Sequence, residues 1–312
     1  MTATLPPGFS RAGDGRLAPP RLFAEAGRDE QFWADGFFKT PLLDDRESAE
    51  LAERFGQLRP ADGFDPTSLT DARCSYHCTF LDPDRSYRRA VDELVRGVFE
   101  QKLRAVVPGY QILTSNIYVK PAGAGRFEIH QNWPTIQDLD VPTMTAWVPL
   151  QDTGFENGTI RLVRGSHHLF PDVAAASSDR FFDDFERDLI ETYLEPIDVR
   201  RGELLVFDDS LLHWSGANIS ATPRVTFQIE LIPDGVPAAL WIRNAADPSM
   251  FDLWAIDKEY WIEYPFESVL GATEGLELLD RCRNPNERIS LAEFEKAMEH
   301  RDEIRRSKFA FG

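Results

Sequence analysis

The chain has 312 residues, of which 42% are hydrophobic, 12% aromatic and 28% charged, as in an ordinary globular protein. Its formal charge of −18 disfavours sequence-independent binding to nucleic acid, which needs a basic surface. No stretch approaches the roughly 20 consecutive apolar residues of a membrane span, and the N-terminus lacks the basic and apolar regions of a signal peptide. We therefore expect a cytoplasmic protein with neither a nucleic acid nor a membrane as partner. No feature of the sequence indicates an oligomeric state.

The three cysteines are too few and odd in number for a disulfide framework, so reduced thiols are expected. Cys74 and Cys78 flank His77 in a pattern typical of half a zinc site, but the second half is missing. In an extended segment His77 faces away from both cysteines. We interpret this run as structural.

Two helices are predicted before the strands begin, and one after they end. Residues 1–30 are rich in proline and glycine without a regular period, which predicts an irregular N-terminal arm. Residues 44–58 and 86–106 then carry apolar residues at helical spacing, and a capping box opens the first of these segments. A further capping box, Ser290 with Glu293, predicts the C-terminal helix.

From Gln111 onward, short runs rich in β-branched and aromatic residues alternate with turn-forming residues, which is typical of strands. Asn157-Gly158 between two such runs predicts a hairpin. Because no regular helices separate the runs, they favour an antiparallel sandwich or barrel. The predicted strands are residues 111–119, 126–132, 143–150, 159–163, 194–199, 203–207, 211–214, 224–232 and 238–243.

We expect one domain over residues 31–312, because no repeat or linker divides this part of the chain. Its β core should cover about 111–243. A helical extension over about 250–312 should then cover the core or form an interface.

Two of the six histidines, His130 and His213, lie in strand-like surroundings with polar partners at useful spacing. Strand alternation puts Glu128, His130 and Asn132 on one face, where neighbouring side chains can converge on a metal. His213 lies far along the chain, so only the fold can bring it to His130. Arg224 follows, and an arginine there can pair bidentately with a carboxylate.

Other ionisable residues near these positions have simpler interpretations. His167 and His168 follow a Gly-Ser turn and are interpreted as loop residues rather than ligands. Asp208 and Asp209 predict a turn ahead of His213, and their charge could raise the basicity of that histidine through a contact behind it.

Five segments in a fixed order carry a family resemblance. They are His130-Gln131-Asn132-Trp133, Trp147-Val148-Pro149-Leu150-Gln151-Asp152, Glu156-Asn157-Gly158-Thr159, Arg164-Gly165-Ser166-His167-His168, and Phe207 through Ser215 with Arg224. Together they resemble the phytanoyl-CoA dioxygenase-like branch of the Fe(II)/2-oxoglutarate-dependent oxygenases, over most of the chain. The resemblance implies a mainly β fold with flanking helices, the double-stranded β-helix or cupin-like jelly roll. It also implies iron held by a His-x-Asp/Glu…His triad.

The resemblance assigns roles to single residues. His130 and His213 resemble the two histidine ligands of iron, and Arg224 resembles the clamp on the distal carboxylate of 2-oxoglutarate. Ser215 and Trp147 resemble further residues of the cosubstrate pocket.

One more part of that pocket is suggested by strand parity. On the strand before the His130 motif, Tyr118 and Lys120 share a face with Asn116. Either Tyr118 or Lys120 could also contact the cosubstrate.

Asn132 departs from the family pattern, which has aspartate at this position. A carboxylate brings negative charge to iron, whereas a carboxamide offers only a neutral oxygen, so metal affinity should fall. Four explanations stay open. Asn132 coordinates or hydrogen-bonds beside iron; a carboxylate is recruited, Glu128 first and Asp138 or Asp140 next; halide or water fills a vacated position, as in related halogenases; or the chain is a weak or metal-free relative.

The function that the resemblance implies is oxidation of a small-molecule C–H bond by a hydroxylase-type dioxygenase that uses Fe(II), 2-oxoglutarate and O₂. The alternatives are a jelly-roll binding protein without metal, and a halogenase. Because Asn132 is neutral, we expect metal binding to be weak alone and strongly coupled to dianionic 2-oxoglutarate.

Overall fold

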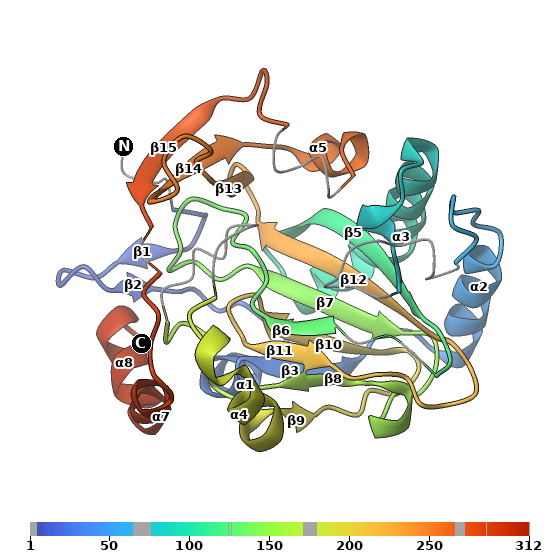
Figure 1. Cartoon of the computed structure of the whole chain (residues 1–312), viewed down its shortest axis with the longest axis horizontal. Helices are drawn as coiled ribbons and strands as arrows, with labels where there is room; N and C mark the ends of the chain where they lie inside the picture. Colours follow the sequence, from blue (N-terminus) through green and yellow to red (C-terminus); the bar gives the residue numbers. More distant parts are fainter. Residues whose placement is uncertain are drawn as a thin grey trace.

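The computed structural model describes residues 5–64, 76–123, 125, 127–170, 180–265, 272–284 and 286–311. Two antiparallel sheets form its centre (Figure 1). The larger sheet has the strand order β3 (Phe37–Pro41), β10 (Glu203–Asp208), β7 (Met144–Pro149), β12 (Arg224–Pro233), β5 (Tyr110–Lys120), β4 (His77–Cys78). The smaller sheet has the order β6 (Phe127–His130), β11 (His213–Ser215), β8 (Ile160–Leu162), β9 (Glu195–Pro196). Within the described residues the strands do not close into a barrel, and the two central sheets with their flanking helices confirm the predicted mainly β jelly roll.

The two faces of the larger sheet differ in polarity. Alternate residues of its central strands, such as Phe227 and Ile229 of β12, belong to the main hydrophobic core on the outer face. Residues of β12 with the opposite parity, such as Arg224 and Gln228, line a cavity on the inner face. The period of a strand therefore separates a packed apolar face from a polar one that is available for chemistry.

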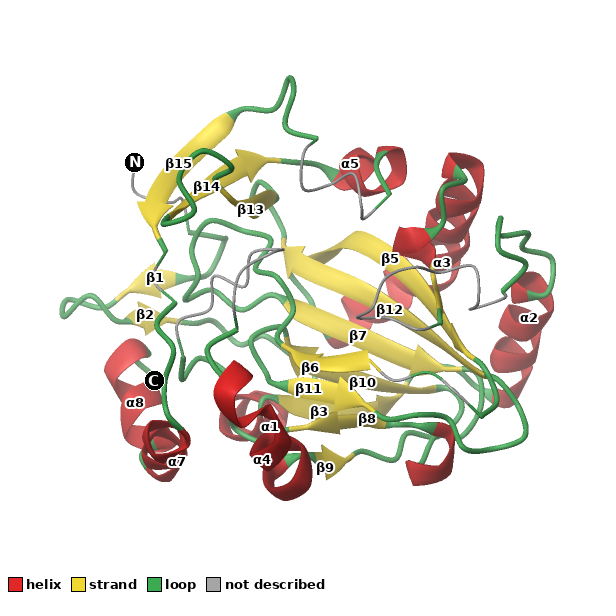
Figure 2. Cartoon of the chain, viewed as in Figure 1, coloured by secondary structure: helices red, strands yellow, loops and turns green. Residues whose placement is uncertain are grey.

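The helix predicted over residues 86–106 exists as α3 (Arg85–Val106), and it covers the outer face of the larger sheet (Figure 2). Its Phe99 packs against Phe227 of β12 with ring centroids 5.7 Å apart. Helix α2 (Asp45–Phe55) begins with the predicted capping box at Asp44. The C-terminal helix α7 (Leu291–Glu299) begins with the other predicted box, and α8 (Arg301–Lys308) follows it. Among the described residues, the remaining helices are α1 (Arg28–Asp35), α4 (Glu186–Asp188) and α5 (Lys258–Glu263), with short 3₁₀ or π turns η2 (Thr79–Leu81), η3 (Phe155–Asn157), η4 (Asp183–Phe185) and η5 (Leu189–Tyr193).

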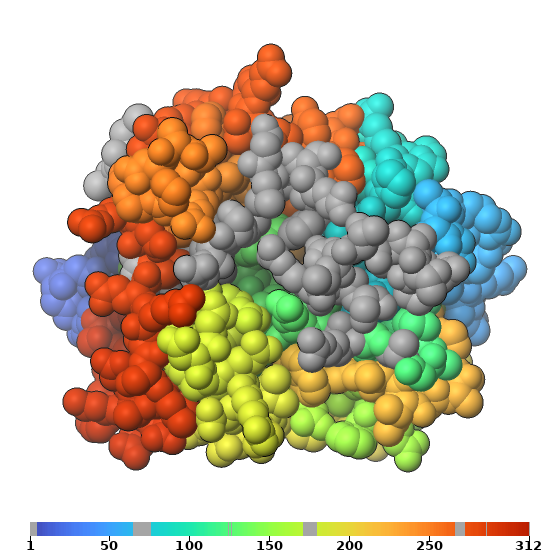
Figure 3. Space-filling view, viewed as in Figure 1, coloured from blue at the N-terminus to red at the C-terminus, as the bar shows by residue number. Residues whose placement is uncertain are grey.

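The N-terminal segment is more ordered than the predicted irregular arm. Strands β1 (Ser10–Arg11) and β2 (Leu17–Ala18) pair as a hairpin. Leu17 is fully buried and forms a parallel bridge with Phe309 after α8. Figure 3 shows this hairpin, in blue, beside the C-terminal helices, in red.

The C-terminal extension is not wholly helical. Strands β14 (Met250–Ala255) and β15 (Leu278–Arg283) pair there, and β13 (Ala239–Arg243) joins them in a third sheet, separate from the two central ones. All nine predicted strands exist with shifted ends, and Leu240 and Ile242 of β13 pack into the main hydrophobic core.

The predicted hairpin at Asn157-Gly158 is wrong, because the strands on either side belong to different sheets. The segment forms η3 instead, and Gly158 adopts a left-handed conformation with φ of 68°. A Cβ atom on Gly158 would lie 2.5 Å from the carbonyl oxygen of Gly216, so only glycine fits this crossover. Within the described residues, no helix has the length and apolar character that crossing a membrane requires.

Candidate active site

The fold brings His130 and His213 together on neighbouring strands of the smaller sheet. They face one another in the pairing of β6 with β11, and their ring centroids are 4.0 Å apart. Each Nδ1 donates to a nearby carbonyl of its own chain segment, 2.7 Å from Glu128 O and 2.9 Å from Leu211 O. This hydrogen bond places the proton on Nδ1, so each Nε2 keeps a lone pair that can bind a metal.

Both histidines are neutral at physiological pH. Burial lowers the pKa of His213 to about 4, although its hydrogen bond to Leu211 opposes the shift. Burial, and next the charge of His213, lower the pKa of His130 well below its ordinary value. Neutral imidazole is the form that binds metals, so no proton has to be displaced first.

A β-bulge decides which neighbours of His130 face the cavity. His213 pairs with His130 and Ser215 pairs with Phe127, so β6 holds one more residue than β11 over this stretch. The extra residue shifts the alternation, and Phe127 lies beside His130 with ring centroids 4.5 Å apart. Glu128 is instead 3.6 Å from Arg180 in an ion pair and does not line the cavity, so its predicted place is wrong.

The other two candidate carboxylates are held elsewhere. Asp138 and Asp140 both form ion pairs with Arg11 of the N-terminal hairpin, at 2.7 and 3.0 Å. Neither lines the cavity that contains the histidines.

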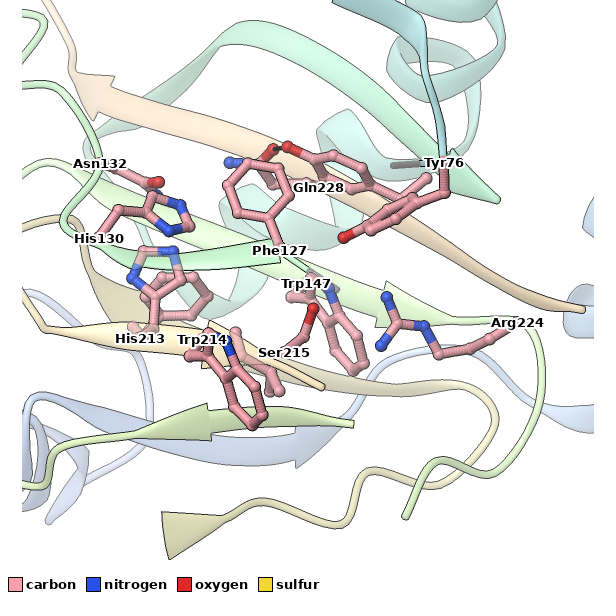
Figure 4. A pocket seen from close by; sticks show the side chains of 13 residues that line it. Tyr76, Phe127, His130, Asn132, Trp147, His213, Trp214, Ser215, Arg224 and Gln228 are labelled. Carbon is pink, nitrogen blue, oxygen red and sulfur yellow. Dashed lines mark hydrogen bonds between the residues drawn. The ribbon is translucent and has the colours of Figure 1, made fainter. Parts of the chain in front are cut away.

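Asn132 lies directly after β6 and lines the same cavity as the histidines. Its Nδ2 donates to Thr145 Oγ1 at 2.8 Å and to Asp209 Oδ1 at 2.9 Å. Its oxygen points toward the imidazoles (Figure 4).

Asp208 and Asp209 do not act on His213 as we expected. Asp208 accepts a hydrogen bond from Ser210 and pairs with His168 at 2.8 Å. Asp209 is buried at 2% exposure, and its contact reaches Asn132, the other candidate ligand. Burial raises the pKa of Asp209 to about 6, and hydrogen bonds from Asn132 and Thr145 oppose the shift.

These donors fit a divalent transition metal. Two neutral imidazole nitrogens and one amide oxygen converge at one end of the cavity (Figure 4). The set has the histidine component of a facial triad but no carboxylate that contacts the metal position directly, so it brings less negative charge.

The cavity extends from this end to Arg224. Figure 4 shows the histidines and Asn132 at one end, Arg224 at the other, and Trp147 and Ser215 between them. The lining residues are Tyr76, Tyr118, Phe127, His130, Asn132, Trp147, Ile160, Phe207, His213, Trp214, Ser215, Arg224 and Gln228.

Arg224 stands at the start of β12 and is only 2% exposed. Its guanidinium donates to the carbonyl of Gly158 and lies 5.6 Å from the ring centre of Trp147. The tight crossover at Gly158 and the flat indole together fix the plane of the guanidinium, which suits bidentate binding of a carboxylate.

Lys120 lies behind the cavity wall rather than in it. It is fully buried, and its Nζ donates to Ser215 Oγ at 2.8 Å and to Gly216 O at 2.5 Å. Tyr118 does line the cavity, and its hydroxyl donates to Gln228 at 2.9 Å. Of the eight residues that the sequence suggested, all except Lys120 therefore line one cavity.

Sequence reasoning missed several lining residues. Gln228 shares the strand face of Arg224, so parity could have found it. Phe127 was hidden by the bulge, and Tyr76 by its place far from the motifs.

The His77 segment forms a separate polar cluster. His77 is fully buried and bonds Asp62 at 2.7 Å and Tyr87 at 2.8 Å, so both ring nitrogens are engaged. Cys78 contacts Asn116, and Cys74 lies outside the described residues. These contacts are consistent with the structural interpretation.

Comparison with known proteins identifies a matching family and a curated relative. Residues 42–226 match the family described as Phytanoyl-CoA dioxygenase (PhyH). A curated relative is the phytanoyl-CoA dioxygenase domain-containing protein 1 homolog of Dictyostelium discoideum, 21% identical over 156 residues, or 47% of this chain and 53% of the relative. The chain thus spans about half the length of the curated relative that it matches.

Solved structures are also similar to this chain, at low sequence identity. The alpha ketoglutarate dependent carbocyclase SnoK from nogalamycin biosynthesis is 18% identical, with 69% of this chain and 86% of SnoK covered and a TM-score of 0.50. HygX from Streptomyces hygroscopicus, solved with nickel, 2-oxoglutarate and hygromycin B, is 17% identical, with 68% and 88% covered and a TM-score of 0.49.

Proposed function

Because the chain belongs to the phytanoyl-CoA dioxygenase family, we propose that it is a non-haem Fe(II)/2-oxoglutarate-dependent dioxygenase that hydroxylates a C–H bond of a small molecule. The observation that carries this proposal is the arrangement of one cavity. Neutral metal-binding groups stand at one end, and a buried arginine stands at the other. Such a cavity suits a short dicarboxylate that chelates a metal with one end and needs a cationic partner for the other.

His130, His213 and the oxygen of Asn132 would hold Fe(II). The bound iron supplies the redox chemistry by which O₂ and 2-oxoglutarate are consumed, with succinate and CO₂ as products. The chain holds both imidazoles in the metal-binding tautomer through Glu128 O and Leu211 O.

Arg224 would bind the distal carboxylate of 2-oxoglutarate with two parallel hydrogen bonds. Ser215 accepts a hydrogen bond from Lys120, so its own hydroxyl proton is directed away from Lys120 and can donate to the same cosubstrate. Lys120 adds positive charge behind this end of the cavity. Because these groups are buried, their charge interactions are stronger than they would be in water.

The charge balance predicts coupling between metal and cosubstrate. Two neutral histidines and a neutral amide leave the charge of Fe(II) without a direct counter-charge, and dianionic 2-oxoglutarate supplies one. An anaerobic titration of Fe(II), followed by the visible metal-to-cosubstrate charge-transfer band, should show tighter metal binding with 2-oxoglutarate than without. Equal Fe(II) affinity in both conditions would contradict this charge argument.

Turnover is tested by succinate formation from 2-oxoglutarate under air, with a panel of small-molecule substrates. Succinate that depends on Fe(II) supports a dioxygenase. A metal-free binding protein is the second candidate, and neutral Asn132 is the observation that favours it. If the chain is such a binding protein, it should take up no metal and should form no succinate with any substrate.

Halogenation requires a vacated ligand position for halide. The side chain of Asn132 fills this position and is held there by two hydrogen bonds, which favours hydroxylation. Chloride or bromide should therefore change neither the charge-transfer band nor the products.

A further inference from the structure

We propose that Asn132 and Asp209 act as one unit, in which the amide oxygen is the third metal ligand and Asp209 is a positioning residue. Asp209 orients the amide from behind and carries the negative charge that the family has at position 132. This inference rests on the proposed function, because it concerns the same metal site.

The backbone fixes Asp209 against Asn132. The carbonyl of Asp209 accepts a hydrogen bond from the backbone N–H of Asn132 at 2.8 Å. The N–H of Asp209 donates to the carbonyl of Thr143 at 3.1 Å. The loop between β10 and β11 is thus fastened both to the end of β6 and to the start of β7, so the carboxylate has a fixed place.

Three side chains then form a closed triangle of hydrogen bonds. Asp209 Oδ1 accepts from Asn132 Nδ2 at 2.9 Å and from the hydroxyl of Thr145 at 2.7 Å. The Thr145 hydroxyl in turn accepts from Asn132 Nδ2 at 2.8 Å. Because these two acceptors lie only 2.7 Å apart, they share one N–H of the amide, and Nδ2 faces them while the amide oxygen faces the histidines (Figure 4).

The triangle permits only one orientation of the amide. A carboxylate can only accept hydrogen bonds, and the proton of Thr145 already points to Asp209. A flipped amide would place its oxygen against the Asp209 oxygen, with no proton between them. The amide oxygen of Asn132 is consequently held toward His130 and His213, where a metal ligand is needed.

The same geometry explains why this chain has asparagine at 132. With aspartate there, a second carboxylate oxygen would replace Nδ2 at 2.9 Å from Asp209 Oδ1. Two ionised carboxylates cannot share this contact without taking up a proton. The pair Asn132 and Asp209 carries a single negative charge, which lies on Asp209, one hydrogen bond away from the metal ligand. Through that hydrogen bond, the carboxylate of Asp209 increases the electron density on the amide oxygen of Asn132.

The surroundings of Asp209 favour a cation nearby. The carboxylate is buried, and among the described residues only the side chain of Thr143 hydrogen-bonds it besides Asn132 and Thr145. A buried negative charge is costly, and a positive charge close by offsets the cost. A metal bound through Asn132 would supply that charge.

The test is a double-mutant cycle with Asn132→Asp, Asp209→Asn and both together, in the full chain. The probe is Mn(II) with saturating 2-oxoglutarate, and free Mn(II) is measured by electron paramagnetic resonance. Asp209→Asn should weaken Mn(II) binding by about 10- to 100-fold in the native background, as for other residues that support metal ligands. In the Asn132→Asp background it should change affinity less than about three-fold, because the amide introduced at position 209 would then donate to the carboxylate introduced at position 132.

Thermal unfolding of the metal-free proteins provides a second readout. Asn132→Asp alone should lower the melting temperature, and adding Asp209→Asn should restore most of the loss. Asp208→Asn is the matched control, because Asp208 is equally buried but bonds His168 and Ser210 instead. It should leave Mn(II) affinity unchanged within about three-fold.

Equal effects of Asp209→Asn in both backgrounds, or no rescue of melting temperature, would overturn the inference while leaving the oxygenase proposal standing. Absence of Mn(II) binding in the native protein, with no charge-transfer band for Fe(II), would instead overturn the proposed function itself.

Discussion

Replacing Arg224 by methionine tests the cosubstrate end of the cavity. Methionine retains most of the side-chain length and its contact with Trp147, but removes the guanidinium. Each hydrogen bond between charged groups contributes about 1.5–3 kcal/mol, and a bidentate pair has two. Because Arg224 is only 2% exposed, water cannot replace the lost partner. A loss of at least about 3 kcal/mol corresponds to a decrease in 2-oxoglutarate affinity of roughly 100-fold or more.

The assay is calorimetric titration of 2-oxoglutarate into the Mn(II)-loaded protein without O₂. The 2-oxoglutarate affinity of Arg224→Lys should lie between those of the native protein and Arg224→Met, because lysine retains the charge but lacks the planar guanidinium. Arg88→Met is the matched control, since Arg88 is also buried but donates to the carbonyls of Ile262 and Asp82, outside the cavity. A folded Arg224→Met protein that binds 2-oxoglutarate within about three-fold of the native protein would refute the assignment.

Three further predictions concern stability. Without metal, His213 alone should contribute a loss of about 3 kcal/mol in the free energy of unfolding as pH decreases from 6.5 to 4, because the unfolded chain then binds a proton that buried His213, with a pKa of about 4, does not; in urea unfolding, His213→Gln should lose less stability than the native protein over this range by about this amount. Gly158→Ala should lower stability by about 1–3 kcal/mol and weaken 2-oxoglutarate binding, because the added Cβ would clash with Gly216 O. Gly123→Ala is the control, because Gly123 has a similar φ but open space around it. A similar loss of stability in Gly123→Ala would show that the clash is irrelevant. Asp44→Ala should cost about 1 kcal/mol in thermal unfolding through loss of the helix cap, with unchanged 2-oxoglutarate affinity.

Local signals in the sequence were reliable where one segment determines its own structure. The capping boxes at Asp44 and Ser290 begin helices, and the runs from Gln111 onward form strands. The family motifs also indicated residues that share a cavity, although His130 and His213 lie far apart in the chain. Caps and strand periods are set by neighbours within a few residues, so the sequence displays them directly.

The errors all involve a partner that is distant in sequence. Parity put Glu128 beside His130, but the bulge depends on pairing with β11 and cannot be read from β6 alone. Asn157-Gly158 has the composition of a hairpin, but its flanking strands find partners in different sheets. We expected Asp209 to act on His213, which is close in sequence, whereas its side chain accepts a hydrogen bond from Asn132. Tertiary contacts of this kind override local preference.

The hydrogen bond between Asn132 and Asp209 also constrains how this site can change in evolution. Each position sets what the other tolerates, because two acids repel at this contact and two amides leave the site without its charge. Substitution at either position alone is then selected against, and the pair should change together. Among relatives of this chain, asparagine at the first position should accompany aspartate at the second, and aspartate at the first should accompany a neutral residue. Such covariation would show that, during evolution, the negative charge of this site moved from one residue to its hydrogen-bonded partner.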